Sequence, residues 1–107
     1  GGARGHDAVR EFVVHTKAPG HPVMKGVPAD FRIVDELYHV TLDPAAKVEV
    51  LAETEVAQKT GRAHPSVWTV AHPKARIICI APGHDARAHD HPAFRALLVN
   101  AVRWAAR

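Results

Sequence analysis

Alternating and uninterrupted hydrophobic positions predict several short strands along the chain. The stretch 11–16 (EFVVHT) is rich in β-forming residues and is ended by a segment with Pro and Gly. Over 47–54 (KVEVLAET) apolar and polar side chains largely alternate, as on a strand with one buried face. Two further apolar runs, 66–71 and 75–81, are separated by HPK, where Pro73 suits a tight turn. We therefore expect these last two runs to form an antiparallel pair.

Another strand-forming stretch, 31–42 (FRIVDELYHVTL), carries two adjacent carboxylates, Asp35 and Glu36. Neighbouring side chains on a strand point to opposite faces, so only one of these carboxylates enters a shared pocket unless the strand kinks. Tyr38 is expected in the core with its hydroxyl hydrogen-bonded. His39 reaches the same pocket only if the backbone bulges.

The end of the chain predicts a helix over 92–106. Asp90 or His91 can cap it, Asp90 being interpreted as a cap rather than as a site residue, and Pro92 falls in its first turn, where a missing N–H costs nothing. An apolar stripe at helical spacing would pack on a sheet. The stripe consists of Phe94, Leu97, Leu98, Ala101, Val102, Trp104 and Ala105.

The run from Ile77 to Ala81 has no polar alternation, which is typical of a strand buried on both faces in the middle of an α/β sheet. Such a sheet needs a helix layer on each side, and the chain predicts one helix with clear periodicity. We therefore expect part of the fold to be missing or to be supplied by a partner. The first ten residues (GGARGHDAVR) agree, since they resemble the middle of a longer or trimmed protein.

The amino-acid composition limits the classes of protein to which the chain can belong. The chain has 107 residues, 47% of them hydrophobic and 23% charged, as in one small globular domain. Its net charge of +3 is scattered, without the basic stripe of a nucleic-acid site, and no apolar run has the length of a membrane span. The only cysteine, Cys79, precludes an intrachain disulfide and mildly favours a reducing cytoplasm over export. Within an apolar run, it is expected to be a small buried hydrophobe.

Titratable side chains crowd into the segment between the last strand and the helix. Open α/β sheets bind ligands at the carboxyl ends of strands, and His84 and Asp85 stand closest to that end. The imidazole of His84 could act as a general base, ligate a metal or simply brace the loop by a hydrogen bond. Further along, His89, Asp90 and His91 belong to the capping segment.

Other histidines suggest a polar cluster: His6, His21 and His39 could join His84 around one pocket. A metal site is the weaker interpretation, because the sequence has neither a CxxC motif nor a His pair four residues apart on a helix. No cofactor is predicted firmly, and a divalent metal such as zinc stays the alternative. The remaining histidines that we considered, His15, His64 and His72, are expected at the surface or at strand edges, and Trp68 in the core.

Several segments in this order resemble the ThuA-like (trehalose utilisation) family. HPVMKGVPADF resembles the family's HP-x-x-x-G-x-P-x-x-F element, DELYH follows in the usual place, and RIICIAPGHD resembles its strand ending in GHD. HPAFRALLVNAVRWAA resembles the terminal helix, and the glycines near the start resemble a mid-domain loop. One departure is the turn before the GHD strand, where HPKAR replaces the usual G-K-G-R.

The resemblance implies an α/β fold of flavodoxin-like type, a three-layer sandwich similar to class I glutamine amidotransferases. The family's domain is about twice as long, so 1–107 would be the C-terminal half of a ThuA-like domain. The implied function is catabolism of trehalose, another disaccharide or a keto-sugar. Asp35 or Glu36 with His84 would be acid and base, and a second group would bind the substrate: His6, His21, Tyr38, His39 and Asp85.

Whether the chain is an enzyme stays open at this point; a sugar-active hydrolase, lyase or isomerase is one reading. The alternatives are a sugar-binding module without catalysis and a fragment that is inert without its first half. The expected partners are a small carbohydrate and either a second copy of the chain or the missing N-terminal half. We expect neither nucleic acid nor membrane as a partner.

Overall fold

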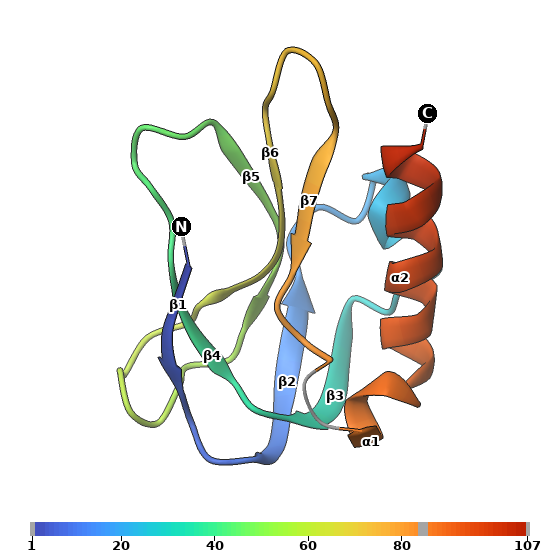
Figure 1. The fold of residues 1–107 in the computed structure, drawn as a ribbon. Coiled ribbons are helices and arrows are strands. Elements are labelled where there is room, and N and C mark those ends of the chain that lie inside the picture. The colour runs from blue at the N-terminus through green and yellow to red at the C-terminus, as the bar shows by residue number, and fades with distance from the viewer. Residues whose placement is uncertain (1, 84–85, 107) are drawn as a thin grey trace.

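The computed structural model describes residues 2–83 and 86–106. Seven strands alternate with short loops before the chain ends in two helices (Figure 1). The elements are β1 (Gly2–His6), β2 (Arg10–Thr16), the short 3-10 helix η1 (Pro22–Met24), β3 (Asp30–Asp35), β4 (Tyr38–Thr41), β5 (Val48–Thr54), β6 (Pro65–Val70), β7 (Ile77–Ile80), α1 (Ala86–His89) and α2 (Pro92–Ala105).

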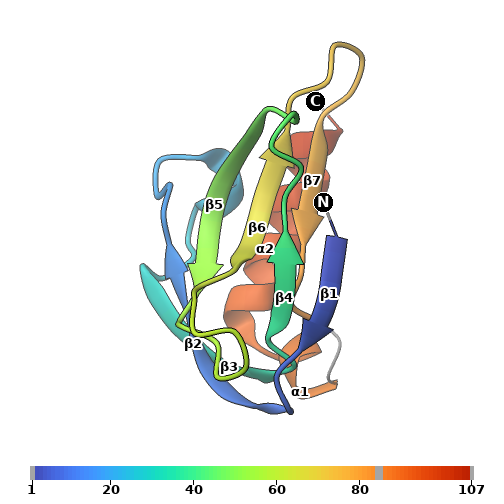
Figure 2. The same cartoon turned by 90° about the vertical axis from the view of Figure 1, so that its left-hand side faces the viewer.

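Five strands form an antiparallel sheet in the order β3-β2-β5-β6-β7, and β1 pairs with β4 in a separate ribbon. Helix α2 and η1 cover one face of the large sheet, while the β1–β4 ribbon lies over the other (Figures 1 and 2). The structure is thus a small mixed α/β domain, rich in strands, with helices on one side of its sheet. The glycine-containing start of the chain, expected to be a loop, is strand β1.

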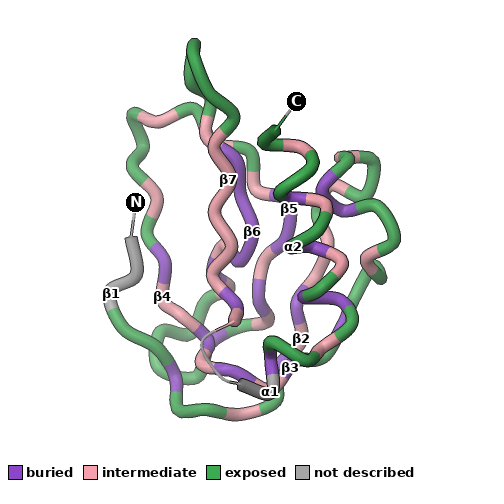
Figure 3. The backbone as a smooth tube through the Cα atoms, turned by 45° about the vertical axis from the view of Figure 1, so that its right-hand side comes forward, coloured by how far each residue is buried: buried purple, intermediate pink, exposed green. Residues whose placement is uncertain are grey.

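The expectation that the run from Ile77 is a central strand is wrong within the described chain. β7 lies at the edge of the sheet and its four residues are half-buried (Figure 3). Its neighbour β6 is the strand with both faces covered, since Ser66, Val67, Trp68 and Thr69 are all buried. A four-residue apolar run looks the same in either place, because its position depends on pairings with distant segments.

The β6–β7 hairpin confirms the predicted antiparallel pair. Its turn is braced by the His72 ring, whose Nδ1 accepts a hydrogen bond of 3.1 Å from the Lys74 amide. No residue other than glycine has a positive φ in the described chain, so this turn needs no glycine. That explains how HPKAR can stand where G-K-G-R is usual.

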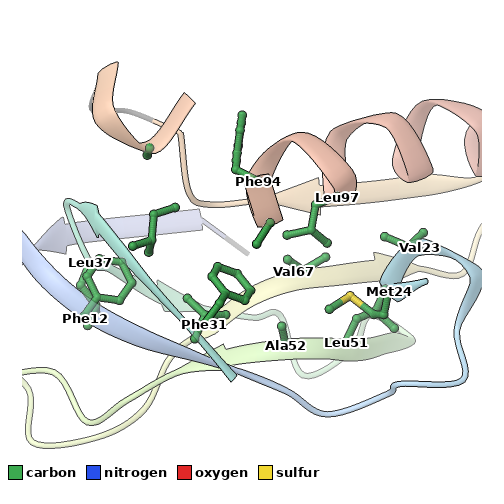
Figure 4. Packing of buried hydrophobic residues seen from close by; sticks show 14 of the residues in the cluster. Phe12, Val23, Met24, Phe31, Leu37, Leu51, Ala52, Val67, Phe94 and Leu97 are labelled. Atoms are coloured by element: carbon green, nitrogen blue, oxygen red, sulfur yellow. The ribbon is translucent and has the colours of Figure 1, made fainter. Parts of the chain in front are cut away.

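The main core lies between the sheet and α2 (Figure 4). Leu97 of α2 points toward the sheet, and Phe94 of α2 and Val23 and Met24 of η1 belong to the same cluster. The sheet contributes Phe12, Val14, Phe31, Ile33, Leu51, Ala52 and Val67 to this cluster. The inward residues of β5 include Leu51 as well as Ala52, because an irregularity in its pairing with β6 interrupts the simple alternation that the sequence suggested.

Helix α2 confirms the predicted terminal helix, decides between the two candidate caps and corrects the apolar face. His91 is the N-cap, and its Nδ1 accepts a 3.0 Å hydrogen bond from the Ala93 amide. Asp90, the other candidate cap, forms an ion pair of 3.0 Å with Arg95. Leu98 is 47% exposed, so it does not belong to the packed stripe, which runs through Phe94, Leu97 and Ala101. No helix in 2–83 or 86–106 combines the length and apolar character needed to cross a membrane.

Candidate functional site

Asp35 is the last residue of β3 and the end of its inward stripe. Phe31 and Ile33 alternate with exposed residues and pack into the core, and the same alternation turns the Asp35 carboxylate inward, where it is 0% exposed. Its Oδ2 accepts a 2.7 Å hydrogen bond from the amide of Gly83. The segment that follows β7 is therefore held against the end of β3, although these strands lie at opposite edges of the sheet.

Glu36 leaves the strand and meets residues of β1. Its Oε2 lies 3.0 Å from Nε2 of His6, and the His6 ring contacts Tyr38 edge-on, with centroids 5.7 Å apart. A register irregularity in the β1–β4 pairing brings His6 opposite Tyr38. Glu36 is largely covered while His6 is 45% exposed, so the carboxylate–imidazole pair reaches solvent through the imidazole. We call Asp35, Glu36, His6, Tyr38 and Gly83 the Asp35 corner.

The Tyr38 hydroxyl stays protonated in this setting. Burial, and then the nearby charges of Glu36 and Asp35, raise the pKa of Tyr38 above its ordinary value. At neutral pH the side chain is therefore a hydrogen-bond donor beside two carboxylates. The Asp35 corner thus combines two carboxylates that accept hydrogen bonds, the imidazole of His6 and the neutral hydroxyl of Tyr38.

His39 belongs to a different cluster, centred on Asp7. Asp7 is 1% exposed and accepts hydrogen bonds from His39 Nε2 at 2.9 Å and from the amides of Gln58 and Lys59. Arg10 adds an ion pair of 3.1 Å. Burial alone would raise the pKa of Asp7, but these hydrogen bonds outweigh it and hold the pKa well below its usual range. Asp7 is thus a fixed anion that ties β1 to the loop after β5.

The expectation that His64 lies at the surface is wrong. It is 1% exposed and its ring lies 5.2 Å from that of His39, centroid to centroid. Nδ1–H donates to the Val40 carbonyl at 3.3 Å, and the Thr60 hydroxyl donates to Nε2 at 2.7 Å. Burial is the main cause that lowers the pKa of His64. Neither Asp7 nor His64 was singled out from sequence, because their roles arise from partners far along the chain.

The structure does not bring His21 to the Asp35 corner. Its Nδ1 accepts from the Val23 amide at 3.2 Å and so caps η1, and its ring lies 5.3 Å from that of Trp104. Trp104 is near the end of α2, whereas Phe94, which lies beside Gly83, is near its start. Ten helical residues separate the two by about 15 Å.

The remaining predicted site residues, His84 and Asp85, lie outside the described residues. Their roles as base and substrate ligand, like those of the other predicted residues, stay predictions. Zinc stays one too: within 2–83 and 86–106, no group of three or more His, Cys, Asp or Glu side chains is arranged to hold a metal ion.

Comparisons with known proteins agree on one family. The family model ThuA, described as trehalose utilisation, matches residues 1–105. The structure superposes with a TM-score of 0.82 on a crystal structure of a ThuA-like protein from Parabacteroides merdae, at 31% sequence identity over 94% of this chain. A ThuA-like protein from Bacteroides uniformis gives a TM-score of 0.72 at 28% identity over 92% of this chain. No curated protein matches.

The match covers less than half of each solved protein. The chain spans 40% of the first of these solved proteins and 44% of the second. The activity of these longer proteins therefore does not follow for this chain from family membership alone. The family model covers nearly every residue, and it shows that this chain belongs to the ThuA family.

Proposed function

We propose that this ThuA protein takes part in the catabolism of a disaccharide or keto-sugar, through proton transfer at the Asp35 corner. The observation that carries the proposal is the 3.0 Å contact between Glu36 and the half-exposed imidazole of His6. The contact places a carboxylate and an imidazole side by side at the surface, and both groups are common in general acid–base chemistry near neutral pH. Family membership supports a sugar as the substrate.

The corner supports different roles for its two carboxylates. Asp35 is fully buried and bonded to the Gly83 amide, so we assign it to positioning rather than to proton transfer. Glu36 lies beside the solvent-reaching His6 and is the better candidate for the acid–base pair. His84 follows Gly83 directly in the sequence and would complete the pair as base, with the protonated Tyr38 donating to a sugar hydroxyl.

The test is turnover of sugars followed by NMR. The purified protein is incubated with trehalose and with its keto derivative, alongside the variants Glu36→Gln and Glu53→Gln. Loss of a general acid or base is expected to slow turnover by about a hundredfold or more in Glu36→Gln. Glu53 forms a surface ion pair with Lys17, so Glu53→Gln is the matched control and should keep its rate. Full activity in Glu36→Gln would refute the assigned role.

A sugar-binding module is the alternative that the same corner supports. Glu36 and His6 satisfy each other, and the neutral Tyr38 hydroxyl can donate to a sugar without any proton transfer. Saturable NMR shifts at His6 and Tyr38 without product would favour this function. Absence of both binding and product would favour a piece that is inert without the rest of a longer domain.

A further inference from the structure

A hollow lies at the end of the sheet opposite to the Asp35 corner. It measures about 510 Å³ and is bordered by the β6–β7 turn, the start of β5 and the last turn of α2. These three elements lie toward the top of Figure 1. Its lining includes Lys47, Glu49, Thr69, His72, Arg76 and Trp104. A neighbouring hollow shares His72 and Arg76 and adds Lys74.

The cations around this hollow are not neutralised by the protein. Elsewhere in the described chain Arg10, Lys17, Arg32 and Arg95 are paired with carboxylates, whereas Lys25, Lys59, Arg62 and Arg103 are not. Within the same described residues, Lys47, Lys74 and Arg76 form no ion pair. Glu49 is the one acidic residue among those that line the first hollow. The surplus of positive charge favours an anionic ligand.

Arg76 is exposed and contacts Trp104 before any ligand arrives. Its guanidinium lies 5.3 Å from the centroid of the Trp104 ring, and its Nη1 donates to the Trp104 carbonyl at 3.5 Å. These two contacts restrict the side chain, so that less conformational entropy is lost when an anion binds. The guanidinium keeps further N–H groups for a planar, bidentate contact with phosphate oxygens.

The rest of the lining can recognise hydroxyl groups. Thr69 and Glu49 lie on facing positions of β6 and β5, and both border the hollow. We propose that the hollow binds a small phosphomonoester, with Lys47 and Arg76 on the phosphate and with Glu49 and Thr69 on hydroxyls, as in a sugar phosphate. This inference does not rest on the proposed function, because none of these residues belongs to the Asp35 corner.

The test is an NMR titration of the 107-residue chain with glucose 6-phosphate, inorganic phosphate and glucose. Both phosphates should shift the Trp104 indole signal and the amides of 69–76 saturably, and glucose should not. Lys47→Ala should weaken binding about tenfold, since a charge-assisted contact is lost. Its side chain is exposed and forms no polar contact in the described structure, so the fold should be kept.

Arg32→Ala is the matched control, because it removes a cation from the far β3 strand and should leave the titration unchanged. The proposal is overturned if neither phosphate gives a saturable shift at the hollow, or if Lys47→Ala binds as tightly as the parent. Shifts at His6 and Tyr38 report on the Asp35 corner separately, so failure of one site is distinguishable from failure of the other.

Discussion

The amide of Gly83 donates a 2.7 Å hydrogen bond to the buried carboxylate of Asp35, and thereby joins the segment that follows edge strand β7 to the end of edge strand β3. β3 and β7 run in the same direction in this antiparallel order, so their carboxyl ends lie at one end of the sheet. The carboxylate satisfies a backbone donor that would otherwise be buried unpaired. We therefore regard this contact as the element that holds Gly83 against the end of β3.

Gly83→Ala should destabilise the fold, because a side chain does not fit at the position where this hydrogen bond holds Gly83. Gly83 has a φ of 109°, and an added Cβ would lie 2.7 Å from the Phe94 ring. The combined backbone and steric strain should cost about 1–3 kcal/mol in free energy of unfolding, measured by urea denaturation. Gly20→Ala is the control, because a Cβ there meets no atom within 4 Å. Equal stabilities of the two variants would contradict the close approach of Gly83 to Phe94.

The neighbouring residues Leu97 and Leu98 test the orientation of α2. Leu97 is 0% exposed and Leu98 is 47% exposed. Leu97→Ala should lower the free energy of unfolding by about 2–5 kcal/mol, because it leaves a cavity in the core. Leu98→Ala should change it by less than about 0.5 kcal/mol. Thermal denaturation followed by circular dichroism would compare them, and a larger loss in Leu98→Ala would mean that the helix is rotated.

Stability should fall on mild acidification because of His64. Its folded pKa is lowered, so below the ordinary value of about 6.5 the unfolded chain takes up a proton before the folded one does. This contribution is therefore complete above pH 6.5 and lost as the pH falls toward the folded pKa. Urea denaturation at pH 7.5 and 5.5 should show the loss, and the loss should shrink in His64→Ala. His72→Ala corrects for removal of an imidazole as such.

Asp7 adds a second loss at lower pH. Its folded pKa is depressed, so the stability that it contributes is present above its ordinary pKa near 3.8 and declines as the pH falls below that value. Asp7→Asn should remove this second step while leaving the first. If the acid transition below pH 4 is the same in Asp7→Asn, the hydrogen bonds from His39, Gln58 and Lys59 do not stabilise the charged form as inferred.

Local sequence signals were sufficient for the hairpin and the terminal helix. Pro73 between two apolar runs marks the turn, and the 3.6-residue period with Pro92 marks the start of α2. The sequence left Asp90 and His91 as alternative caps, because Arg95 pairs with the Asp90 carboxylate only once the helix has formed.

Long-range pairing decided what the sequence could not. The apolar run of β7 has the same pattern at an edge as in the centre, and only its lack of a second neighbour in the described sheet distinguishes them. Of the residues that the sequence suggested for one pocket, Glu36, His6 and Tyr38 lie together. His21 lies elsewhere, because it caps η1 and contacts Trp104. His64 is buried by Thr60 and Val40, and no local pattern reports such partners.

The open edge of β7 predicts self-association of the isolated chain. Ile77–Ile80 are half-buried, and their outer backbone groups have no neighbouring strand in the described sheet. Exposed Leu98, Val99 and Val102 on α2 add apolar surface. Edges of this kind invite pairing with another chain, and a lysine on the edge is a common way to prevent it.

On a sizing column with light scattering, the 107-residue chain should therefore elute larger than a monomer and bind a hydrophobic dye, and Ile77→Lys should shift it toward monomer. Val56→Lys adds the same charge at an exposed loop position away from this edge and should leave the association unchanged. A parent chain that is monomeric, melts cooperatively and binds no dye would show that this edge is stable in water, and the expectation of a partner for β7 would then fail.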